Sequence, residues 1–309
     1  MSAITSASFA KALWPGVKTW YGDAYAQYPV EWDKLFEKNT SRRSFEEEVG
    51  GSYFGLSSVK SEGASITYDS ARQGYTSRYN HVVYALGFII TRETYEDDQY
   101  DVVGKMKANS LAFSMRQSKE IVGANVYNRA FNTSYVGGDS ATLVASAGGG
   151  GSTTAPNVAG GTYTNGVATA SDLSEAALEQ ACIDIAGFTN DRGLKIAVRP
   201  KTLVIPKELM FEATRILKTE GQVYSADNTL NAIKTMGMIP QVVVNHYLTD
   251  TDAWFILTDV KNGLKYFERR GDEFGMDEDF DTENAKYKAT SRYSFGWTDR
   301  RAIYGSPGA

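Results

Sequence analysis

Histidine and cysteine are scarce in this chain. Its 309 residues include two histidines, His81 and His246, and one cysteine, Cys182. A single cysteine excludes an intramolecular disulfide, and no HxxxH or CxxC spacing supports a metal site. Acid–base catalysis has few histidines to draw on, and the GxSxG nucleophile motif is absent. We therefore predict that the protein is not an enzyme and has no catalytic residue, cofactor or metal.

Long apolar runs and a strong net charge are also absent. No stretch approaches the roughly 20 apolar residues of a membrane-spanning helix, and residues 1–16 do not have the pattern of a signal peptide. The net charge of −5 supplies no basic field for nucleic acid. The hydrophobic fraction of 42% is that of an ordinary globular protein. We expect a folded protein made in the cytoplasm, with no membrane contact and no sequence-specific DNA binding.

Two partial motifs are better explained without a ligand. Residues 148–153 read GGGGST, but the lysine of a phosphate-binding loop is missing, so a flexible loop is favoured. Asp277, Asp279 and Asp281 alternate as in a calcium loop, but the turn glycine and the closing glutamate of an EF-hand are missing. A looser divalent site and a solvated acidic turn both remain open, and the turn is favoured.

Tyrosine is the residue in excess, with 19 in the chain and 12% aromatic residues overall. It combines a large contact area with a polar tip, which suits partly hydrated interfaces. Residues 1–41 add three tryptophans and are interrupted by Pro15, Gly16 and Pro29. This pattern predicts an arm that docks on its own domain or on a neighbour.

Residues 42–92 are predicted to form a long hairpin. Short runs rich in Tyr, Val, Ile and Thr indicate strands, the first over 52–59, and residues 61–63 form a turn. The outer half has too few aliphatic residues to bury a core. We therefore expect this hairpin to project and to find a partner.

The clearest helix is predicted from about residue 95 to residue 131, with Thr94 as its N-cap and Asp97 as the capping-box partner. Its length would be on the order of 50 Å. Lys119 is expected to point outward. An apolar stripe follows one face of the helix and consists of Leu111, Met115, Val122 and Val126.

The remaining chain is predicted to be mixed α+β. Residues 137–170 are poor in charge and rich in Gly, Ser, Thr and Ala, which predicts a long loop or flexible connection. Asp172 is expected to cap a second helix, and Asn262-Gly263 is a strong hairpin signal. Residues 286–297 alternate between an aromatic face and a basic or polar face, which predicts a long strand. The apolar face of the second helix is expected to contain Leu173, Ala177, Ala181, Ile185 and Phe188.

Four stretches resemble the Mu-like group of major head proteins of tailed bacteriophages. They are residues 200–210 (PKTLVIPKELM), 242–258 (VVVNHYLTDTDAWFILT), 263–271 (GLKYFERRG) and 287–306 (YKATSRYSFGWTDRRAIYGS). The order of elements is similar to that of the HK97-like capsid fold. The resemblance implies an N-terminal arm (1–41), an extended loop lying over a neighbour (42–92), a peripheral-domain spine helix (93–136), a Gly/Ser/Thr-rich loop (137–170), an axial domain (171–268) and a C-terminal strand returning to the peripheral domain (269–309).

The same resemblance implies a structural protein, the major capsid subunit of an icosahedral phage head. Copies would assemble as pentamers and hexamers in the virion capsid and enclose double-stranded DNA. Scaffold, portal and decoration proteins would be further partners, and synthesis would occur in the host bacterial cytoplasm. A β-rich binding or adhesin-like module is the alternative, against which stand the missing export signal and the long charged helix.

One acidic segment suggests a contact between subunits. Residues 271–285 contain seven acidic residues and no basic residue. They therefore need a positive counter-charge nearby. Arg42 and Arg43 at the basic root of a neighbour's hairpin could supply it, as could Arg269 and Arg270 just before the acidic segment. The candidate assembly residues are Arg42, Arg43, Tyr53, Phe54, Tyr75, Tyr79, Asp277, Asp279 and Asp281.

Overall fold

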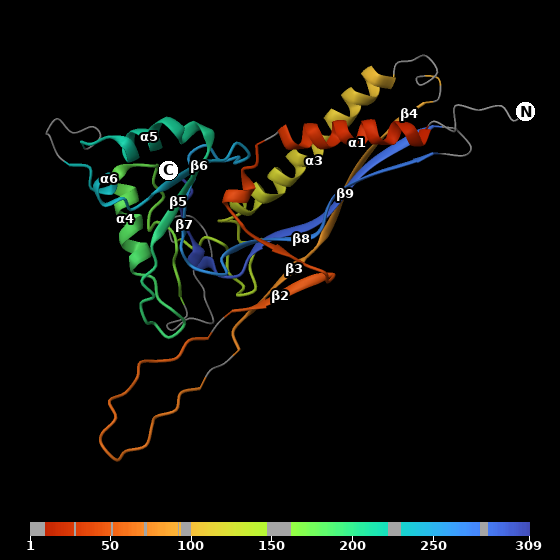
Figure 1. The fold of residues 1–309 in the computed structure, drawn as a ribbon. Helices are drawn as coiled ribbons and strands as arrows, with labels where there is room; N and C mark the ends of the chain where they lie inside the picture. The colour runs from red at the N-terminus through yellow and green to blue at the C-terminus, as the bar shows by residue number, and fades with distance from the viewer. Residues whose placement is uncertain are drawn as a thin grey trace, which may run out of the picture.

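The computed structural model describes residues 10–27, 29–50, 52–70, 73–91, 93, 100–146, 162–221, 230–278 and 284–309, and gives the backbone alone at 10–17, 100–102 and 278. The described strands form two four-stranded sheets and a two-stranded ribbon. Figure 1 shows one sheet with short helices at one end, the other sheet with two long helices extending away from it, and a loop projecting below. The predicted α+β class is confirmed. None of the described helices is long and apolar enough to cross a membrane.

The first sheet has the strand order β1-β8-β9-β4, and only β1 and β8 are parallel neighbours. Helices α1 and α3 pack together over one of its faces (Figure 1). These elements are β1 (Glu37–Thr40), β4 (Val82–Ile90), β8 (Leu264–Glu278), β9 (Ala285–Trp297), α1 (Ala10–Gln27) and α3 (Tyr100–Asn128). The apolar core beneath the helices includes Tyr21, Ala24, Leu111, Met115, Tyr287 and Ala289.

The patterns predicted for α3 and β9 are confirmed. Leu111 and Met115 are buried and Val122 and Val126 are half-buried, as the apolar stripe requires. On β9, the face that begins with Tyr287 is buried toward the helices, whereas Lys286 and Lys288 are exposed. The expected cap of α3, Thr94 with Asp97, lies outside the described residues.

Lys119 does not point outward, and that expectation was wrong. It is only 4% exposed, and its Nζ lies 2.8 Å from Oδ2 of Asp272 in β8. The stripe pattern identifies the most apolar face of a helix but not how far its neighbours extend around it. Because α1 and β8 both flank α3, the polar residue beside the stripe is covered too.

Helix α1 also departs from the expected arm. The predicted interruption at Pro15 and Gly16 is wrong, since the helix runs through both residues. Proline removes one backbone N–H but fixes φ near the helical value, so a helix can continue through it at a cost. Tyr21 and Ala24 are buried against the same chain, so this part of the segment docks on its own subunit.

The second sheet has the order β10-β7-β5-β6. Its elements are β5 (Pro200–Ile205), β6 (Gln241–Val244), β7 (Trp254–Thr258) and β10 (Ile303–Ser306), with helices α4 (Glu175–Ala186), α5 (Met210–Lys218) and α6 (Ala232–Met236). Three short 3-10 turns are η2 (Trp32–Lys34), η3 (Lys207–Leu209) and η4 (Arg300–Ala302). The core between the second sheet and its helices includes Leu178, Ile185, Leu203, Ile216 and Trp254.

The N-cap of α4 is Ser174 rather than Asp172. The Ser174 hydroxyl accepts a hydrogen bond from the backbone N–H of Ala177 at 3.2 Å. The Asp172 carboxylate instead accepts one from the backbone N–H of Ala309 at 3.0 Å. Aspartate and serine are both common N-cap residues, so the prediction from sequence spacing named the wrong one of the two. The predicted apolar face of α4 is confirmed, because Leu173, Ala181, Ile185 and Phe188 are buried and Ala177 packs against them.

The predicted hairpin at Asn262-Gly263 is wrong. Asn262 does adopt the left-handed conformation with φ of 60°, but β7 before it and β8 after it belong to different sheets. A second crossing, from β9 to β10, runs beside the first: Thr298 N donates to Gly263 O and Asp299 N to Asn262 O, both at 3.0 Å. The turn chemistry was correct, but it does not determine which strands pair.

The Gly/Ser/Thr-rich stretch is not a flexible connection in its described parts. Residues 141–146 are buried, as are Tyr163, Asn165 and Val167, whereas residues 147–161 lie outside the described part. Leu143 and Val144 pack in the core between the two sheets. Small uncharged residues suit a solvated loop and a tightly packed coil equally well. The described parts are therefore a loop, as one of the two predictions had it, but they are packed rather than flexible.

Candidate assembly surface

A long loop projects between β2 (Phe45–Val49) and β3 (Thr76–Asn80), which pair antiparallel. The predicted turn is confirmed at its tip, where Ala64 N donates to Ser61 O at 3.1 Å and Gly63 has a φ of 76°. The strand predicted over 52–59 is wrong, because the described residues there join no ladder. From Tyr53 to Ser70, the described backbone makes only this tip hydrogen bond to another backbone group.

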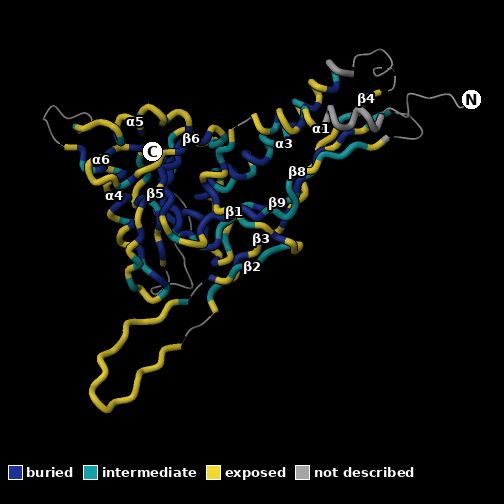
Figure 2. The backbone as a smooth tube through the Cα atoms, viewed as in Figure 1, coloured by how far each residue is buried: buried dark blue, intermediate teal, exposed yellow. Residues whose placement is uncertain are grey.

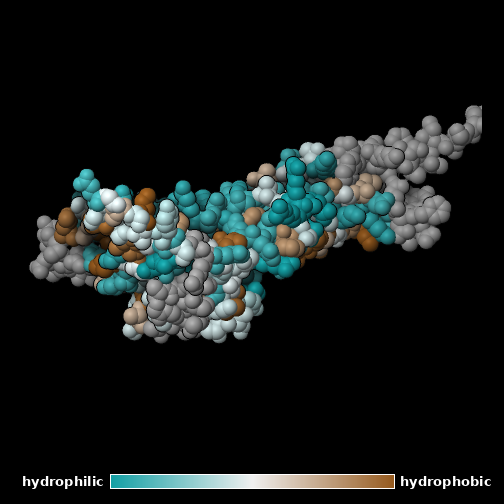
Figure 3. All heavy atoms as spheres, turned by 90° about the horizontal axis from the view of Figure 1, so that it is seen from below, coloured by the Kyte–Doolittle hydropathy of each residue, from teal (hydrophilic) through white to brown (hydrophobic). Residues whose placement is uncertain are grey.

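Every residue from Tyr53 to Ser70 is exposed, as Figure 2 shows along the whole loop. Val59 reaches 98% exposure. Large apolar side chains gathered on one exposed segment are typical of an interaction site. They are Tyr53, Phe54, Leu56, Val59, Ile66 and Tyr68. Figure 3 shows further apolar surface at the compact end of the molecule and along its narrow extension.

A turn after α4 holds both limbs of the loop near their base. Arg192 donates from Nη2 to Ser70 O at 2.8 Å and lies 3.5 Å from Asp69 Oδ1. The neighbouring Asp191 carboxylate accepts a hydrogen bond from Tyr53 N at 3.1 Å. Asp69 also accepts from Gly55 N and from Ser70 N, which together hold the pKa of its carboxyl below the ordinary value. These exposed contacts set the direction of the loop.

Buried polar contacts fix the root of the loop. Tyr75 Oη donates to Thr298 O at 2.7 Å, and Tyr79 Oη shares a 2.5 Å hydrogen bond with Thr298 Oγ1. Thr298 Oγ1 also donates to Glu48 at 2.7 Å, and Glu48 pairs with buried Lys265 at 2.5 Å. Tyr79 is only 4% exposed, so its side chain is unavailable to a neighbouring subunit. Tyr75 is half-buried and also serves to hold the root.

The other candidate contact residues remain in solvent. Arg42 and Arg43 are exposed between β1 and β2, and Arg43 lies 4.0 Å from Glu46. At this distance and exposure the pair contributes little. Tyr53 and Phe54 are exposed on the loop. These four residues stay in the proposed contact set.

The acidic segment begins as a strand rather than as the expected turn. Asp277 is exposed on β8, opposite Lys286 of β9. Asp272 instead lies on the side of the helices, where it accepts from Lys119 and, at 2.6 Å, from Tyr25 Oη. Arg270, one of the predicted counter-charges, lies 3.5 Å from Glu273, and Lys286 of β9 supplies a further one that the sequence did not predict. The two remaining candidates, Asp279 and Asp281, lie outside the described residues.

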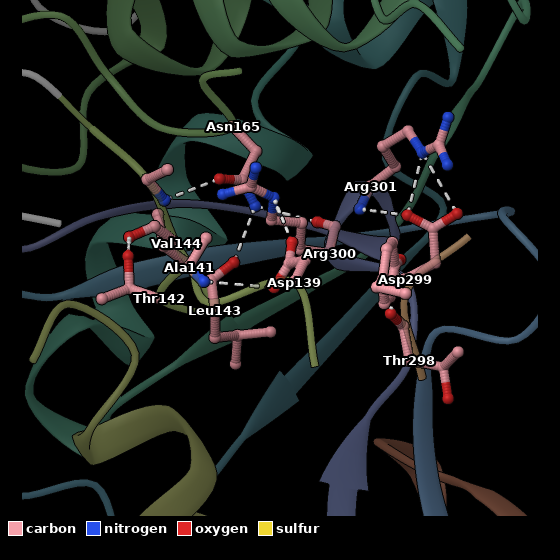
Figure 4. Close-up of polar contacts among 12 residues, drawn as sticks. Asp139, Ala141, Thr142, Leu143, Val144, Asn165, Thr298, Asp299, Arg300 and Arg301 are labelled. Atoms are coloured by element: carbon pink, nitrogen blue, oxygen red, sulfur yellow. Dashed lines mark hydrogen bonds and ion pairs between the residues drawn. The ribbon is translucent and has the colours of Figure 1, made fainter. Parts of the chain in front are cut away.

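Asn165 joins the segments that meet between the two sheets (Figure 4). Its Oδ1 accepts from Ala145 N at 2.7 Å, and its Nδ2 lies within 2.9 Å of three carbonyl oxygens. Those carbonyls belong to Leu143, Arg300 and Ile303. One amide side chain therefore joins three backbone segments, and it is the partner of Ala145 N and of Leu143 O, whereas Arg300 O also accepts from Ile303 N.

Two ion pairs lie beside this amide (Figure 4). Arg300 lies 3.1 Å from Asp139 with both side chains buried, and Arg301 lies 2.9 Å from Asp299. Burial raises the pKa of the Asp139 carboxyl, and Arg300 opposes that shift. Because Arg300 and Arg301 directly follow Thr298 and Asp299, these contacts also support the root of the loop.

Sequence reasoning missed Asn165, Arg192 and the Asp139–Arg300 pair. Asn165 stands before a glycine and therefore resembled an ordinary turn signal. Asp139 did carry a signal, since it is the one charged residue within 137–170. A lone charge in an otherwise uncharged segment indicates a buried partner elsewhere.

The two histidines and the cysteine each have different surroundings. His81 is buried, with its ring nitrogens 2.9 Å from Ser294 Oγ and 3.1 Å from Ser41 Oγ. His246 is exposed and lies 2.5 Å from Glu31. Cys182 is buried, which raises the pKa of its thiol to about 11. Within the described ranges, no group of three or more His, Cys, Asp or Glu residues could hold a metal.

Several solved structures share this fold. The crystal structure of a virus-like particle from Pyrococcus furiosus matches with a TM-score of 0.53 at 10% identity over 94% of this chain and 98% of that chain. The capsid of an empty GTA particle gives 0.55 at 14% identity over 90% and 89%. Microbacterium phage Oxtober96 gives 0.50 at 10% identity over 91% and 93%. At such identities the likeness shows the fold, which is the one used by shell-forming proteins.

A family model described as phage capsid protein matches residues 74–306. The chain therefore belongs to the phage capsid protein family. Its role is structural and its place is the virion capsid, as the resemblance to major head proteins predicts. No match was found among curated proteins. The Mu-like subgroup stays a prediction.

Proposed function

We propose that this chain is the repeating subunit of a phage head and that its copies meet as pentamers and hexamers of an icosahedral shell. The projecting loop carries the argument, because it exposes Phe54, Leu56, Val59, Ile66 and Tyr68 on a segment that its own subunit does not cover. Each copy can offer this loop to one neighbour and receive a loop from another. A head-to-tail contact of this kind forms a ring when the rotation between successive copies closes.

The finer assignments follow from the family resemblance and remain part of this proposal. The axial domain (171–268) would lie near the capsomer centre, and the peripheral domain would carry the spine helix. The shell would enclose double-stranded DNA without sequence-specific contacts. Scaffold, portal and decoration proteins would join it, after synthesis in the host bacterial cytoplasm. Arg42, Arg43, Tyr53, Phe54, Asp277, Asp279 and Asp281 are the residues we propose at the contacts.

Electron microscopy of the purified chain, alone and after coexpression with the neighbouring genes of its phage, tests the function. We expect closed shells, rings or tubes in at least one of the two preparations. A protein that sediments as a monomer in both preparations at every concentration would contradict the proposal. A loop-deleted control, with residues 53–70 replaced by a short Gly/Ser linker, should fold and remain unassembled.

A further inference from the structure

The projecting loop is attached to the first sheet at its root. Tyr79 of β3 is buried against Phe267 of β8, with the ring centroids 4.8 Å apart. A Cβ added at Gly296 of β9 would lie 2.9 Å from the Tyr79 ring, so the ring packs directly against the backbone there. Glu48 of β2 pairs with Lys265 of β8, whose side chain is only 6% exposed. Buried contacts of this kind hold the root firmly on β8 and β9.

The two limbs of the same loop are attached to the second sheet's unit a few residues further out. Asp191 and Arg192 lie in the turn between α4 and β5, close in sequence to Phe188, which is buried in the core of the second sheet. Arg192 donates to Tyr53 O at 3.3 Å and to Ser70 O at 2.8 Å, so one guanidinium holds both limbs. Asp191 accepts from Tyr53 N on the first limb. We call the contacts of Asp191 and Arg192 with residues 53, 69 and 70 the latch.

The base of the loop therefore connects the two sheets. Its path is short, because two residues separate Gly50 from Tyr53 and four separate Ser70 from Tyr75. The two limbs are also joined to each other, since Gly50 N donates to Tyr75 O at 2.7 Å. A segment fixed at two points on two bodies must bend or detach when those bodies move relative to each other. The root and the latch together thus form a brace between the sheets.

The brace lies on one side of the core that the two sheets share. In the view of Figure 1, α3 meets the second sheet above this core and the loop leaves below it. On the upper side, the amide of Asn128 donates to Tyr247 O at 3.2 Å and accepts from Thr249 N at 3.0 Å. On the lower side, the latch makes the corresponding connection. A joint held on two sides resists rotation about its centre more than a joint held on one side.

The latch is the weaker of the two attachments. The side chains of Arg192 and Asp69 are 38% and 41% exposed, so water competes for their contacts. The root is held instead by buried side chains such as Tyr79 and Lys265. A movement that exceeds what the brace tolerates therefore opens the latch and leaves the root in place.

We propose that this brace couples the direction of the projecting loop to the relative position of the two sheets. While the latch is closed, each restrains the other, because such a coupling is reciprocal. When the latch opens, the loop turns about its root, and the sheets lose their connection on that side. The coupling belongs to a single subunit and therefore goes beyond the proposed function. Under that function, a neighbour that holds the loop also restrains the two sheets of the subunit that carries it.

Distance measurements between spin labels on the two sheets test the coupling in the unassembled subunit, verified as a monomer by sedimentation. Lys288→Cys on β9 and Thr214→Cys on α5 provide two exposed attachment points, and Cys182 is buried. Asp191→Ala together with Arg192→Ala removes the latch from the side of the second sheet. The width of the distance distribution should then increase about twofold, because the brace is cut.

A second variant cuts the same connection from the other side. Replacement of residues 53–70 by a short Gly/Ser linker removes the limbs and leaves the turn intact. It should widen the distribution as much as the latch variant does, and combining the two changes should add nothing, because both remove one connection. Lys195→Ala, at an exposed position of the same turn, is the control and should leave the width unchanged. Circular dichroism checks that each variant is folded.

Two results would overturn the coupling. One is an unchanged width in the latch variant and the loop replacement. The other is additive widening when they are combined, because two separate connections would then be involved. The measurement uses no particles, so its result stands whether or not the subunit assembles, and a failure of assembly counts against the proposed function alone.

Discussion

The ammonium group of Lys119 lies 2.8 Å from the carboxylate of Asp272, and this pair joins α3 to β8. Tyr25 of α1 donates to the same carboxylate oxygen at 2.6 Å. Three elements far apart in the sequence therefore share one acidic side chain. The two charged groups are largely removed from water, so each depends on the other.

Lys119→Met should destabilise the subunit by about 3 kcal/mol, because it leaves Asp272 as a largely buried charge without its partner. The midpoint of urea unfolding measures this loss. Lys105→Met, an exposed substitution on the same helix, is the control and should change the midpoint little. Equal effects of the two substitutions would show that the ion pair contributes nothing.

Arg192→Ala should release the projecting loop from the turn that holds it. In the unassembled subunit, chymotrypsin should then cleave after Phe54 or Tyr68 faster than in the unmodified protein. In particles, the loop should be protected in both proteins. Arg215→Ala removes a more exposed arginine from α5 and should leave the cleavage rate unchanged. If Arg192→Ala also leaves it unchanged, the contacts of Arg192 do not restrain the loop.

Asn165→Ala should cost more than about 3 kcal/mol. It leaves the N–H of Ala145 and the carbonyl of Leu143 without a partner, each at a cost of about 1–3 kcal/mol, and also removes the amide contacts to Arg300 O and Ile303 O. Thermal unfolding followed by circular dichroism measures the change. Asn132→Ala, at an exposed position, is the control. A small effect at Asn165 would mean that water replaces the amide.

His81 should make the stability of the subunit depend on pH. Burial and the nearby Arg292 lower the pKa of His81, while Glu46 opposes the shift. The unfolded chain therefore binds a proton at a higher pH than the folded chain does. Stability should be full above about pH 6.5 and should fall as the pH drops below it. His81→Gln should assemble normally and lose less stability between about pH 7 and pH 5. An unchanged pH profile would contradict this assignment.

The contact proposed for the acidic segment can be tested by charge reversal. Asp279→Lys together with Asp281→Lys should lower particle yield and make assembly less tolerant of salt, with little change in melting temperature. One exposed pair contributes only about 0–1 kcal/mol, but a shell repeats it many times. Reversing Glu208 of η3 and Glu212 of α5 controls for net charge. Normal yield and an unchanged salt response in the double variant would indicate that the segment is a solvated surface without a contact to a neighbouring subunit.

Side-chain periodicity correctly predicted which face of a helix or strand is buried. Leu111 and Met115 on α3 and Tyr287 and Tyr293 on β9 were identified in this way and are buried as expected. Lys119 was misplaced because periodicity says nothing of how many neighbours surround a helix. Its partner Asp272 is far away in the sequence, and no local pattern links the two.

Local composition failed where backbone partners decide the outcome. Residues 141–146 look like a solvated loop, yet they are buried because Asn165 and neighbouring backbone groups satisfy their hydrogen bonds. Asn262-Gly263 formed a turn, but strand pairing depended on β9, which follows much later. The projecting loop was predicted correctly because a shortage of aliphatic residues is a property of the segment itself.

The position of β9 has a consequence for biosynthesis. β4 emerges from the ribosome long before β9, which among the described strands is its only partner. Until β9 is synthesised, both edges of β4, an apolar strand of nine residues, lack a partner among the described strands. The first sheet cannot form before then, because β9 lies between β8 and β4. A nascent chain is therefore at its most prone to aggregation during synthesis of its second half. Growth conditions that slow translation there should lower the soluble yield more than slowing earlier in the message.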